Sequence, residues 1–382
     1  MKKKVFVGMS GGVDSSVTAA LLKSEGYDVT GVFIKVWQPD FIECTWKEDR
    51  LDAMRVASVL DIPFVTLDLE KEYKQGVIDY MIDEYKKGRT PNPDVMCNRE
   101  VKFGAFLKWA MEMGADYVAT GHYAMIAKNV TDTFVAGPHE KTHRTDEYGS
   151  SSHFPAPQSP YHFSQSSNLL QKSKDQEKDQ TYFLWTLTSE QLEHVLFPVG
   201  HLEKREVRVL AEKYGLPNKA KKDSQGLCFV GTIDIKTLLK KYIEEKKGDV
   251  VNEKGEVIGY HEGVMFYTIG ERHGFVITKK STEDAPYFVI AKDFDKNSLT
   301  VSHTPPEEKR GNTLEVESVV WNKNIQKGEV YEARARYRAP CATVRVVDEN
   351  HFEVVSGNVV ATSGQSLVLY DGELCIGGGI LK

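Results

Sequence analysis

The feature that most restricts the fold is a glycine- and serine-rich stretch near the start of the chain. It reads Gly-Met-Ser-Gly-Gly-Val-Asp-Ser-Ser over residues 8–16. The apolar run at residues 4–7 predicts a buried strand before it, and apolar residues at helical spacing predict a helix after it, ending at Gly26. A strand, a glycine turn and a helix in this order direct helix N–H groups and serine hydroxyls at an anion, which predicts a phosphate cradle. No lysine follows the glycines, so this is not the nucleotide loop that ends in Gly-Lys-Ser/Thr.

The segments that follow alternate between strand and helix patterns. The strand patterns cover residues 28–37, 64–67 and 116–120, and the helix patterns cover residues 51–60, 71–87, 189–196 and 203–214. This alternation predicts an α/β fold with a doubly wound parallel sheet and helices on both faces. Ligands of such sheets bind beyond the carboxyl ends of the strands, which is where the glycine stretch lies.

The sequence pattern changes after about residue 247, where short alternating strands are separated by Gly, Asn and Asp turns. This pattern predicts small β-barrels. We therefore expect an adenylation domain over residues 1–236, a central barrel-like domain over 237–305 and a C-terminal β-barrel over 306–382. Within the first domain, residues 138–177 are rich in Ser, His, Pro, Gln and Lys, which predicts a low-complexity insertion without core residues.

Composition narrows the class of protein further. The five cysteines are odd in number and scattered, which argues against a disulfide framework, and no signal peptide or membrane span is expected. We therefore predict a cytoplasmic protein that does not bind a membrane. The net charge of −6 gives no general attraction to nucleic acid, but basic clusters at residues 204–222 and 334–345 can act locally. Taken alone, such clusters more often form solvated surface.

Two cysteines and one histidine stand in settings that suit chemistry. Cys97 follows the rigid loop at residues 90–94, and we expect it at the N-terminus of a helix that starts near Asn98, where the dipole lowers a thiol pKa. Cys228 lies between glycines and after basic residues, and His122 directly follows a predicted strand. An inert buried cysteine and a hydrogen-bonded structural histidine stay open as alternatives. No further paired ligands lie near either cysteine, so we predict no zinc or other protein-bound metal site.

Together these motifs resemble the tRNA-specific 2-thiouridylases, a family of the ATP pyrophosphatase (PP-loop) class. The resemblance extends over nearly the whole chain and rests on residues 8–15, 88–94, 97–98, 119–123, 178–180, 226–231, 364–366 and 375–380. Two departures stand out. Ile34 occupies a position where methionine is common in the family, and the 138–177 insertion departs from its compact form.

The resemblance implies roles for individual residues. Those implied to bind ATP are Gly8, Met9, Ser10, Gly11, Gly12, Val13, Asp14, Ser15, Ile34 and Gly121. Those implied to contact tRNA are Asn92, Pro93, Asp94, His122, Lys178, Asp179, Gln180, Arg336, Tyr337 and Gln365. Cys97 is implied as the nucleophile and Cys228 as the persulfide carrier, and Asp94 is our candidate for moving a proton near the base.

The implied reaction replaces the C2 oxygen of the wobble uridine with sulfur. ATP, with Mg²⁺, adenylates that oxygen, and a cysteine persulfide then supplies sulfur, with AMP and pyrophosphate as the other products. Direct persulfide attack and release of hydrosulfide both stay open. The expected partners are tRNA, a sulfur donor (a cysteine desulfurase or a sulfur-relay protein) and a cellular reductant.

Three other interpretations share part of the pattern. A tRNA lysidine synthetase or an amide-forming synthetase would share the glycine loop but would not need the two cysteines. A 4-thiouridine synthetase would share the sulfur chemistry but act on another position of the base. A non-catalytic RNA-binding protein could use the barrels, but it would leave residues 8–15 without a role.

Overall fold

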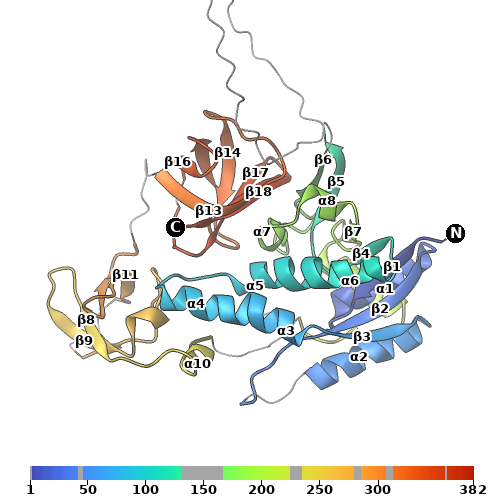
Figure 1. Cartoon of the computed structure of the whole chain (residues 1–382), viewed down its shortest axis with the longest axis horizontal. Coiled ribbons are helices and arrows are strands. Elements are labelled where there is room, and N and C mark those ends of the chain that lie inside the picture. The colour runs from blue at the N-terminus through green and yellow to red at the C-terminus, as the bar shows by residue number, and fades with distance from the viewer. Residues whose placement is uncertain are drawn as a thin grey trace, which may run out of the picture.

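The computed structural model describes residues 2–41, 46–130, 167–223, 235–278, 285–306, 313–357 and 359–382 (Figure 1). Its first sheet is parallel throughout and has the strand order β3-β2-β1-β4-β7. The strands are β1 (Lys4–Gly8), β2 (Asp28–Lys35), β3 (Phe64–Asp68), β4 (Tyr117–Ala119) and β7 (Val195–Leu196). The order reverses between β1 and β4, so the loops after these two strands meet at the switch point of a doubly wound sheet.

Helices cover both faces of this sheet. Successive residues of β1 point to opposite faces of the sheet, so they belong to two different hydrophobic cores. Val5 and Val7 pack with α1 (Val13–Ser24), α2 (Trp46–Val59) and α9 (Lys204–Lys213). Phe6 packs instead with the helices of the opposite face. Those helices form two continuous runs, α3 (Glu70–Tyr73), η1 (Lys74–Asp79) and α4 (Tyr80–Lys86), then α5 (Pro93–Met96), η2 (Cys97–Phe106) and α6 (Leu107–Glu112). The remaining described α-helices are short: α7 (Thr181–Leu184), α8 (Ser189–Leu192) and α10 (Ile235–Leu239).

The second sheet forms the small unit at the left of Figure 1 and has the order β10-β9-β8-β12-β11. Its elements are β8 (Gly248–Val251), β9 (Val257–His261), η3 (Val264–Phe266), β10 (Val276–Ile277), β11 (Phe288–Asp293) and β12 (Ser298–Ser302). Pairing within it is antiparallel except between β8 and β12.

The third sheet closes into a barrel, because β13 pairs with both β16 and β18. The barrel strands are β13 (Thr313–Trp321), β14 (Val330–Arg334), β15 (Ala342–Val346), β16 (His351–Ser356), β17 (Ser366–Asp371) and β18 (Leu374–Leu381). A hairpin from the first half of the chain, β5 (Met125–Val130) and β6 (Ser167–Gln171), extends this sheet by pairing with β18. The predicted fold class, a doubly wound parallel sheet followed by β-barrel domains, is confirmed.

Two predicted helix bounds are wrong. The helix expected near Asn98 begins at Pro93, because Asn92 caps it and proline suits its first turn. The pattern at residues 189–196 is helical only to Leu192 and ends in β7.

The insertion predicted over residues 138–177 includes ordered residues from 167 onward. Leu169 and Leu170 are buried on β6, so this part is core rather than a dispensable segment. Residues 131–166 lie outside the described part of the chain. Within the described residues, no helix is long and apolar enough to cross a membrane.

Candidate active site

The glycine stretch lies where the sequence predicts it, between the end of β1 and the start of α1. Gly11 has a positive φ of 74°, and a Cβ there would lie 2.3 Å from the backbone oxygen of Asp49. Gly121, after β4, is similarly constrained, since its Cβ would lie 2.6 Å from the Ser15 nitrogen. Only glycine lets the backbone come this close to α2 at Gly11 and to the N-terminus of α1 at Gly121, so the loop is a tight backbone cradle.

The serines of the cradle and a downstream asparagine hold its shape. The Ser15 and Ser16 hydroxyls both donate to the Gly12 oxygen, at 3.1 and 2.8 Å. The buried Asn218 amide donates to the Gly11 oxygen and to the Ser16 hydroxyl, both at 2.9 Å. The segment after α9 therefore supports the cradle from a position some two hundred residues away in sequence.

Asp14 is the charged group of the cradle. Its carboxylate accepts a hydrogen bond of 2.9 Å from the Tyr123 hydroxyl and is 2.7 and 2.9 Å from the Lys204 ammonium. Burial and the neighbouring Asp14 raise the pKa of Tyr123, so its hydroxyl stays a donor. In the sequence Lys204 is only one member of a basic cluster, because its pairing with Asp14 forms only in the folded chain.

Lys204 also reaches Asp223, at 2.7 Å, and joins the cradle to a second cluster. Asp223 forms further ion pairs with Arg208 at 2.8 Å and Lys178 at 3.0 Å. Burial raises the pKa of Asp223, but the hydrogen bonds from Lys204 and Lys178 outweigh it and hold that pKa at about 2. Much of the basic cluster at 204–222 is therefore neutralised by carboxylates rather than left open to solvent.

The helix that carries Cys97 has an unusual structure. The Asn92 side chain accepts hydrogen bonds from the nitrogens of Asp94 and Val95, so the helix starts at Pro93. Cys97 lies one turn further in, is fully buried, and opens the π-helix η2. The prediction that Cys97 lies at a helix N-terminus is therefore wrong, and the dipole acts on it less strongly than expected. Helical π segments are rare and often occur at functional sites.

His122 connects this helix with the loop after β4. Its Nδ1 is 2.7 Å from the Thr120 hydroxyl, and its Nε2 is 3.3 Å from the Lys102 ammonium of η2. Burial, and to a lesser extent Lys102, lower the pKa of His122 well below its ordinary value. The imidazole is therefore neutral at pH 7 and lies between the cradle side and the Cys97 helix.

The residues at 178–180 lie beside the cradle network. Asp179 is buried, accepts hydrogen bonds from the Ser173 nitrogen and the Thr181 hydroxyl, and has a pKa raised by burial. Gln180 exchanges hydrogen bonds with the backbone of Tyr123, at 2.9 Å in both directions. The tripeptide Lys-Asp-Gln occurs at residues 174–176 and again at 178–180. The second of these contacts the loop after β4.

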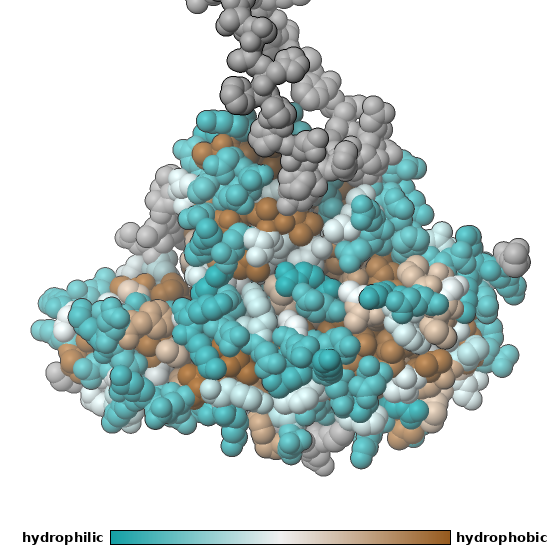
Figure 2. All heavy atoms as spheres, viewed as in Figure 1, coloured by the Kyte–Doolittle hydropathy of each residue, from teal (hydrophilic) through white to brown (hydrophobic). Residues whose placement is uncertain are grey.

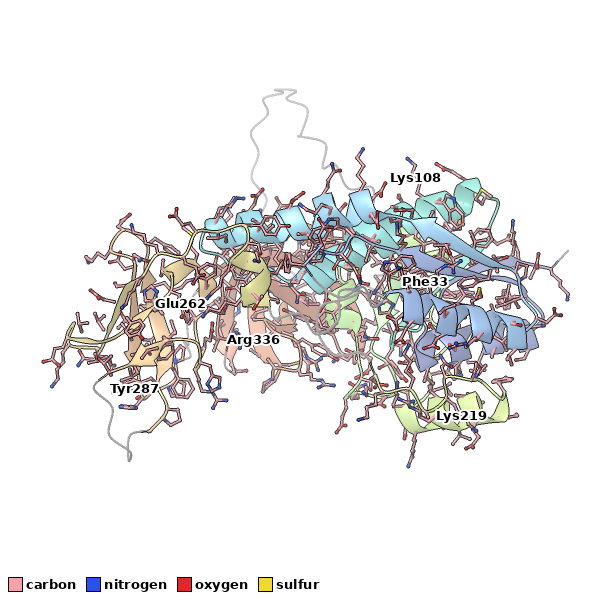
Figure 3. All side chains as sticks on the ribbon, turned by 90° about the horizontal axis from the view of Figure 1, so that it is seen from below. Phe33, Lys108, Lys219, Glu262, Tyr287 and Arg336 are labelled. Atoms are coloured by element: carbon pink, nitrogen blue, oxygen red, sulfur yellow. The ribbon has the colours of Figure 1, made fainter. Side chains whose placement is uncertain are left out.

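The three barrel residues of the predicted tRNA set lie in different settings. Arg336 is exposed and is labelled on the barrel in Figure 3, whereas the Tyr337 ring packs on Phe183 with centroids 4.4 Å apart. Gln365 donates a hydrogen bond of 2.7 Å to the Thr90 oxygen, two residues before Asn92. The barrel thus reaches the loop that starts the Cys97 helix.

Two further residues predicted to bind ATP are buried near the cradle. Ile34 is buried on β2, and Met9 is buried at the start of the cradle, its nitrogen donating to the Val32 oxygen. Cys228 lies outside the described residues. Within the described residues no group of three or more His, Cys, Asp or Glu side chains could hold a metal ion.

Hydrophilic and apolar side chains are unevenly distributed over the surface of the molecule. Figure 2 shows a mostly hydrophilic face on which apolar side chains gather in separate small areas. In Figure 3, Arg336 and Lys219 lie in the lower half of the view, away from Lys108 on α6 at the upper edge.

The chain has a phosphate-type cradle at the switch point of a parallel sheet, and two small β units follow it. This arrangement is that of a PP-loop protein with appended barrel domains. Family models match the chain throughout. The tRNA methyl transferase HUP domain matches residues 3–232, the tRNA methyl transferase PRC-barrel domain matches 236–303, and the aminomethyltransferase β-barrel domain matches 311–381.

Curated relatives identify the family within that class. The tRNA-specific 2-thiouridylase MnmA of Streptococcus thermophilus is 43% identical over 100% of this chain and 95% of its own. Those of Halalkalibacterium halodurans and Listeria monocytogenes are 43% and 42% identical, over 99% of this chain and 94% of theirs. The chain belongs to the tRNA-specific 2-thiouridylase family. It is thus a PP-loop transferase that forms 2-thiouridine in tRNA, and the predicted family and enzyme class are confirmed.

Proposed function

We propose that this chain thiolates the wobble uridine of tRNA in two chemical steps carried out at one site, between the cradle and the Cys97 helix. The observation that carries the proposal is the linkage of the two: His122 and Tyr123, on the loop after β4, contact Lys102 of η2 and Asp14 of the cradle. The first step needs a triphosphate, and the second needs a thiol near the same base.

The residues present fit ATP and its metal ion. The backbones of Asp49 and of Asp14–Ser15 fill the Cβ positions of Gly11 and Gly121, so these close contacts hold the loop at the N-terminus of α1. Free N–H groups at a helix N-terminus suit phosphate oxygens. Magnesium is usually held by one or two carboxylates together with substrate phosphates, and Asp14 is the candidate carboxylate. Bound there, the ion would neutralise phosphate charge. Lys204 is placed to bind the same phosphates when it leaves Asp14.

In the first step the C2 oxygen of uridine bonds to the α-phosphorus of ATP and pyrophosphate leaves. The cradle N–H groups and Lys204 stabilise the charge that develops on the leaving group. Asn92, Pro93 and Asp94 would receive the splayed base, and the half-buried Asp94 would accept the proton that the base loses.

In the second step sulfur from a Cys228 persulfide bonds to C2 and AMP leaves with the former C2 oxygen. Cys97 either attacks the Cys228 sulfur of the resulting mixed disulfide or first releases hydrosulfide, which then attacks C2. Each route leaves a Cys97–Cys228 disulfide, which a two-electron reductant must reduce. A sulfur donor, a cysteine desulfurase or a relay protein, restores the persulfide, and we expect the cycle to run in the cytoplasm.

Contacts with tRNA are proposed along the exposed arginines of the barrel and at His122, Tyr337, Gln365 and residues 178–180. Burial of Asp179 and the internal hydrogen bonds of Gln180 mean that these two would act mainly by shaping the surface. Lys178 and Arg336 are the better candidates for phosphate contacts, so affinity should fall with salt.

The test is mass spectrometry of nucleosides from unmodified tRNA treated with the enzyme, ATP, Mg²⁺, a persulfide donor and a reductant. We expect 2-thiouridine at the wobble position and one AMP per thiolated base. Appearance of 4-thiouridine or lysidine, or thiolation without ATP, would refute the proposal.

A further inference from the structure

The short segment that leads into the Cys97 helix, residues 88–91, contacts both the small sheet and the barrel. It follows α4 and ends at the Asn92 cap of α5. In Figure 1, α4 and α5 lie below the barrel and to the right of the small sheet.

The small sheet contacts the segment from one side. The Lys292 ammonium of β11 donates to the Gly88 oxygen at 2.7 Å and to the Tyr267 oxygen at 2.9 Å. The Thr268 and Thr90 hydroxyls are 3.0 Å apart. Gly88 has a positive φ of 77°, and its missing Cβ makes room for a phenyl ring, that of Phe294.

The barrel contacts the segment from the other side. The Thr90 nitrogen donates to the Ser363 oxygen at 2.8 Å, and Gln365 donates to the Thr90 oxygen. Arg89 forms an ion pair of 2.6 Å with Glu317. Gly364 is pressed against Thr90 so closely that a Cβ would lie 2.9 Å from the Thr90 nitrogen and carbonyl carbon.

Because residues 93–112 form one continuous helix, a shift of Thr90 is carried to Asp94 and Cys97 on that helix. We propose that Gly364 of the barrel and Lys292 of the small sheet are positioning residues for the thiolation step: the two units hold the start of the Cys97 helix and thereby set where Asp94 and Cys97 stand. This inference rests on the proposed function for the roles of Asp94 and Cys97. On this inference the barrel positions groups that react in thiolation, in addition to any contact it makes with tRNA.

The chain offers a closely matched pair of variants. Gly364 and Gly328 both lie in the barrel segment, both have a φ of 91°, and both donate a backbone hydrogen bond of 2.8 Å to a barrel strand. A Cβ at Gly328 would meet nothing within 4 Å, whereas one at Gly364 would displace Thr90. Gly364→Ala and Gly328→Ala thus carry the same backbone strain, but only the first moves the segment.

The rate test is single-turnover thiolation at saturating tRNA, together with tRNA affinity. Gly364→Ala is expected to lower the rate about tenfold, since displacements of a fraction of an ångström in reacting groups have effects of this size. Its tRNA affinity should stay within about twofold, and Gly328→Ala should behave as the wild type. Equal rates for the two alanine variants would overturn the inference.

A second pair of variants and a measurement by hydrogen exchange test the positioning role separately from misfolding and from the proposed function. Lys292→Met removes the donor to Gly88. Its control is Lys296→Met, at an exposed lysine in the turn between β11 and β12. Hydrogen exchange of the peptide over residues 88–97 should be faster in Gly364→Ala and Lys292→Met than in their controls. Unchanged exchange in both would overturn the positioning role even if thiolation were never observed, whereas a wild-type enzyme without 2-thiouridine product would refute only the proposed function.

Discussion

Asp14→Asn is the most direct test of the nucleotide cradle. The asparagine keeps the shape of the side chain and can still accept the hydrogen bond from Tyr123, but it removes the charge that faces Lys204. Both partners of this ion pair are partly buried, with side-chain exposures of 16% for Lys204 and 29% for Asp14, so its loss should cost about 1 kcal/mol of stability. Out of a typical total of about 5–15 kcal/mol, that loss leaves the protein folded at 25 °C.

The expected effect on adenylation is much larger. Loss of a charged group that organises phosphate and metal in a preorganised site typically costs about 100-fold in rate, equivalent to about 2.7 kcal/mol. The assay is tRNA-dependent AMP formation at saturating ATP, with tRNA affinity and thermal unfolding measured in parallel. Asp28→Asn, at the exposed start of β2, is the matched control. An Asp14→Asn rate within threefold of the control would refute the role of the cradle.

Three further outcomes test other parts of the molecule. Cys228→Ser should abolish 2-thiouridine formation while tRNA affinity stays within about threefold, and Cys341→Ser in the barrel should leave both unchanged; nucleoside mass spectrometry and filter binding decide. Leu170→Ala, at a buried position on β6, should lower the free energy of unfolding by about 3 kcal/mol in urea titrations, and a loss under about 1 kcal/mol would contradict the packing. Burial lowers the pKa of Lys292 to about 8 from 10.5, so the unfolded chain binds an extra proton between these values. The wild-type free energy of unfolding should therefore rise from pH 8 to 10 relative to Lys292→Met, and parallel curves would exclude the shift.

The parallel sheet was predictable because its signal is local. Buried strands such as residues 29–34 are nearly continuous in apolar residues, and the glycine stretch marks the junction of β1 and α1. The helix start at Pro93 was also encoded, since Asn-Pro is a good cap and first position, but two prolines in three residues suggested a loop instead.

What sequence reasoning missed depends on contacts between distant segments. Leu169 and Leu170 are a short apolar pair in polar surroundings, and only pairing with β18 makes them a core strand. Similarly, Lys204 looks like one more surface cation until the fold brings it to Asp14 and Asp223. The order of motifs predicted the family and the candidate residues, but not these partners.

The hairpin β5–β6 has a mechanical consequence. Through the main-chain pairing of Leu170 with Cys375, the catalytic half of the chain and the barrel share one ladder of hydrogen bonds. With the proposed tRNA contacts on the barrel, this ladder would fix the distance between a bound RNA stem and the cradle. Selection among tRNAs would then depend on the length and bend of the stem that leads to the anticodon, before any base is contacted.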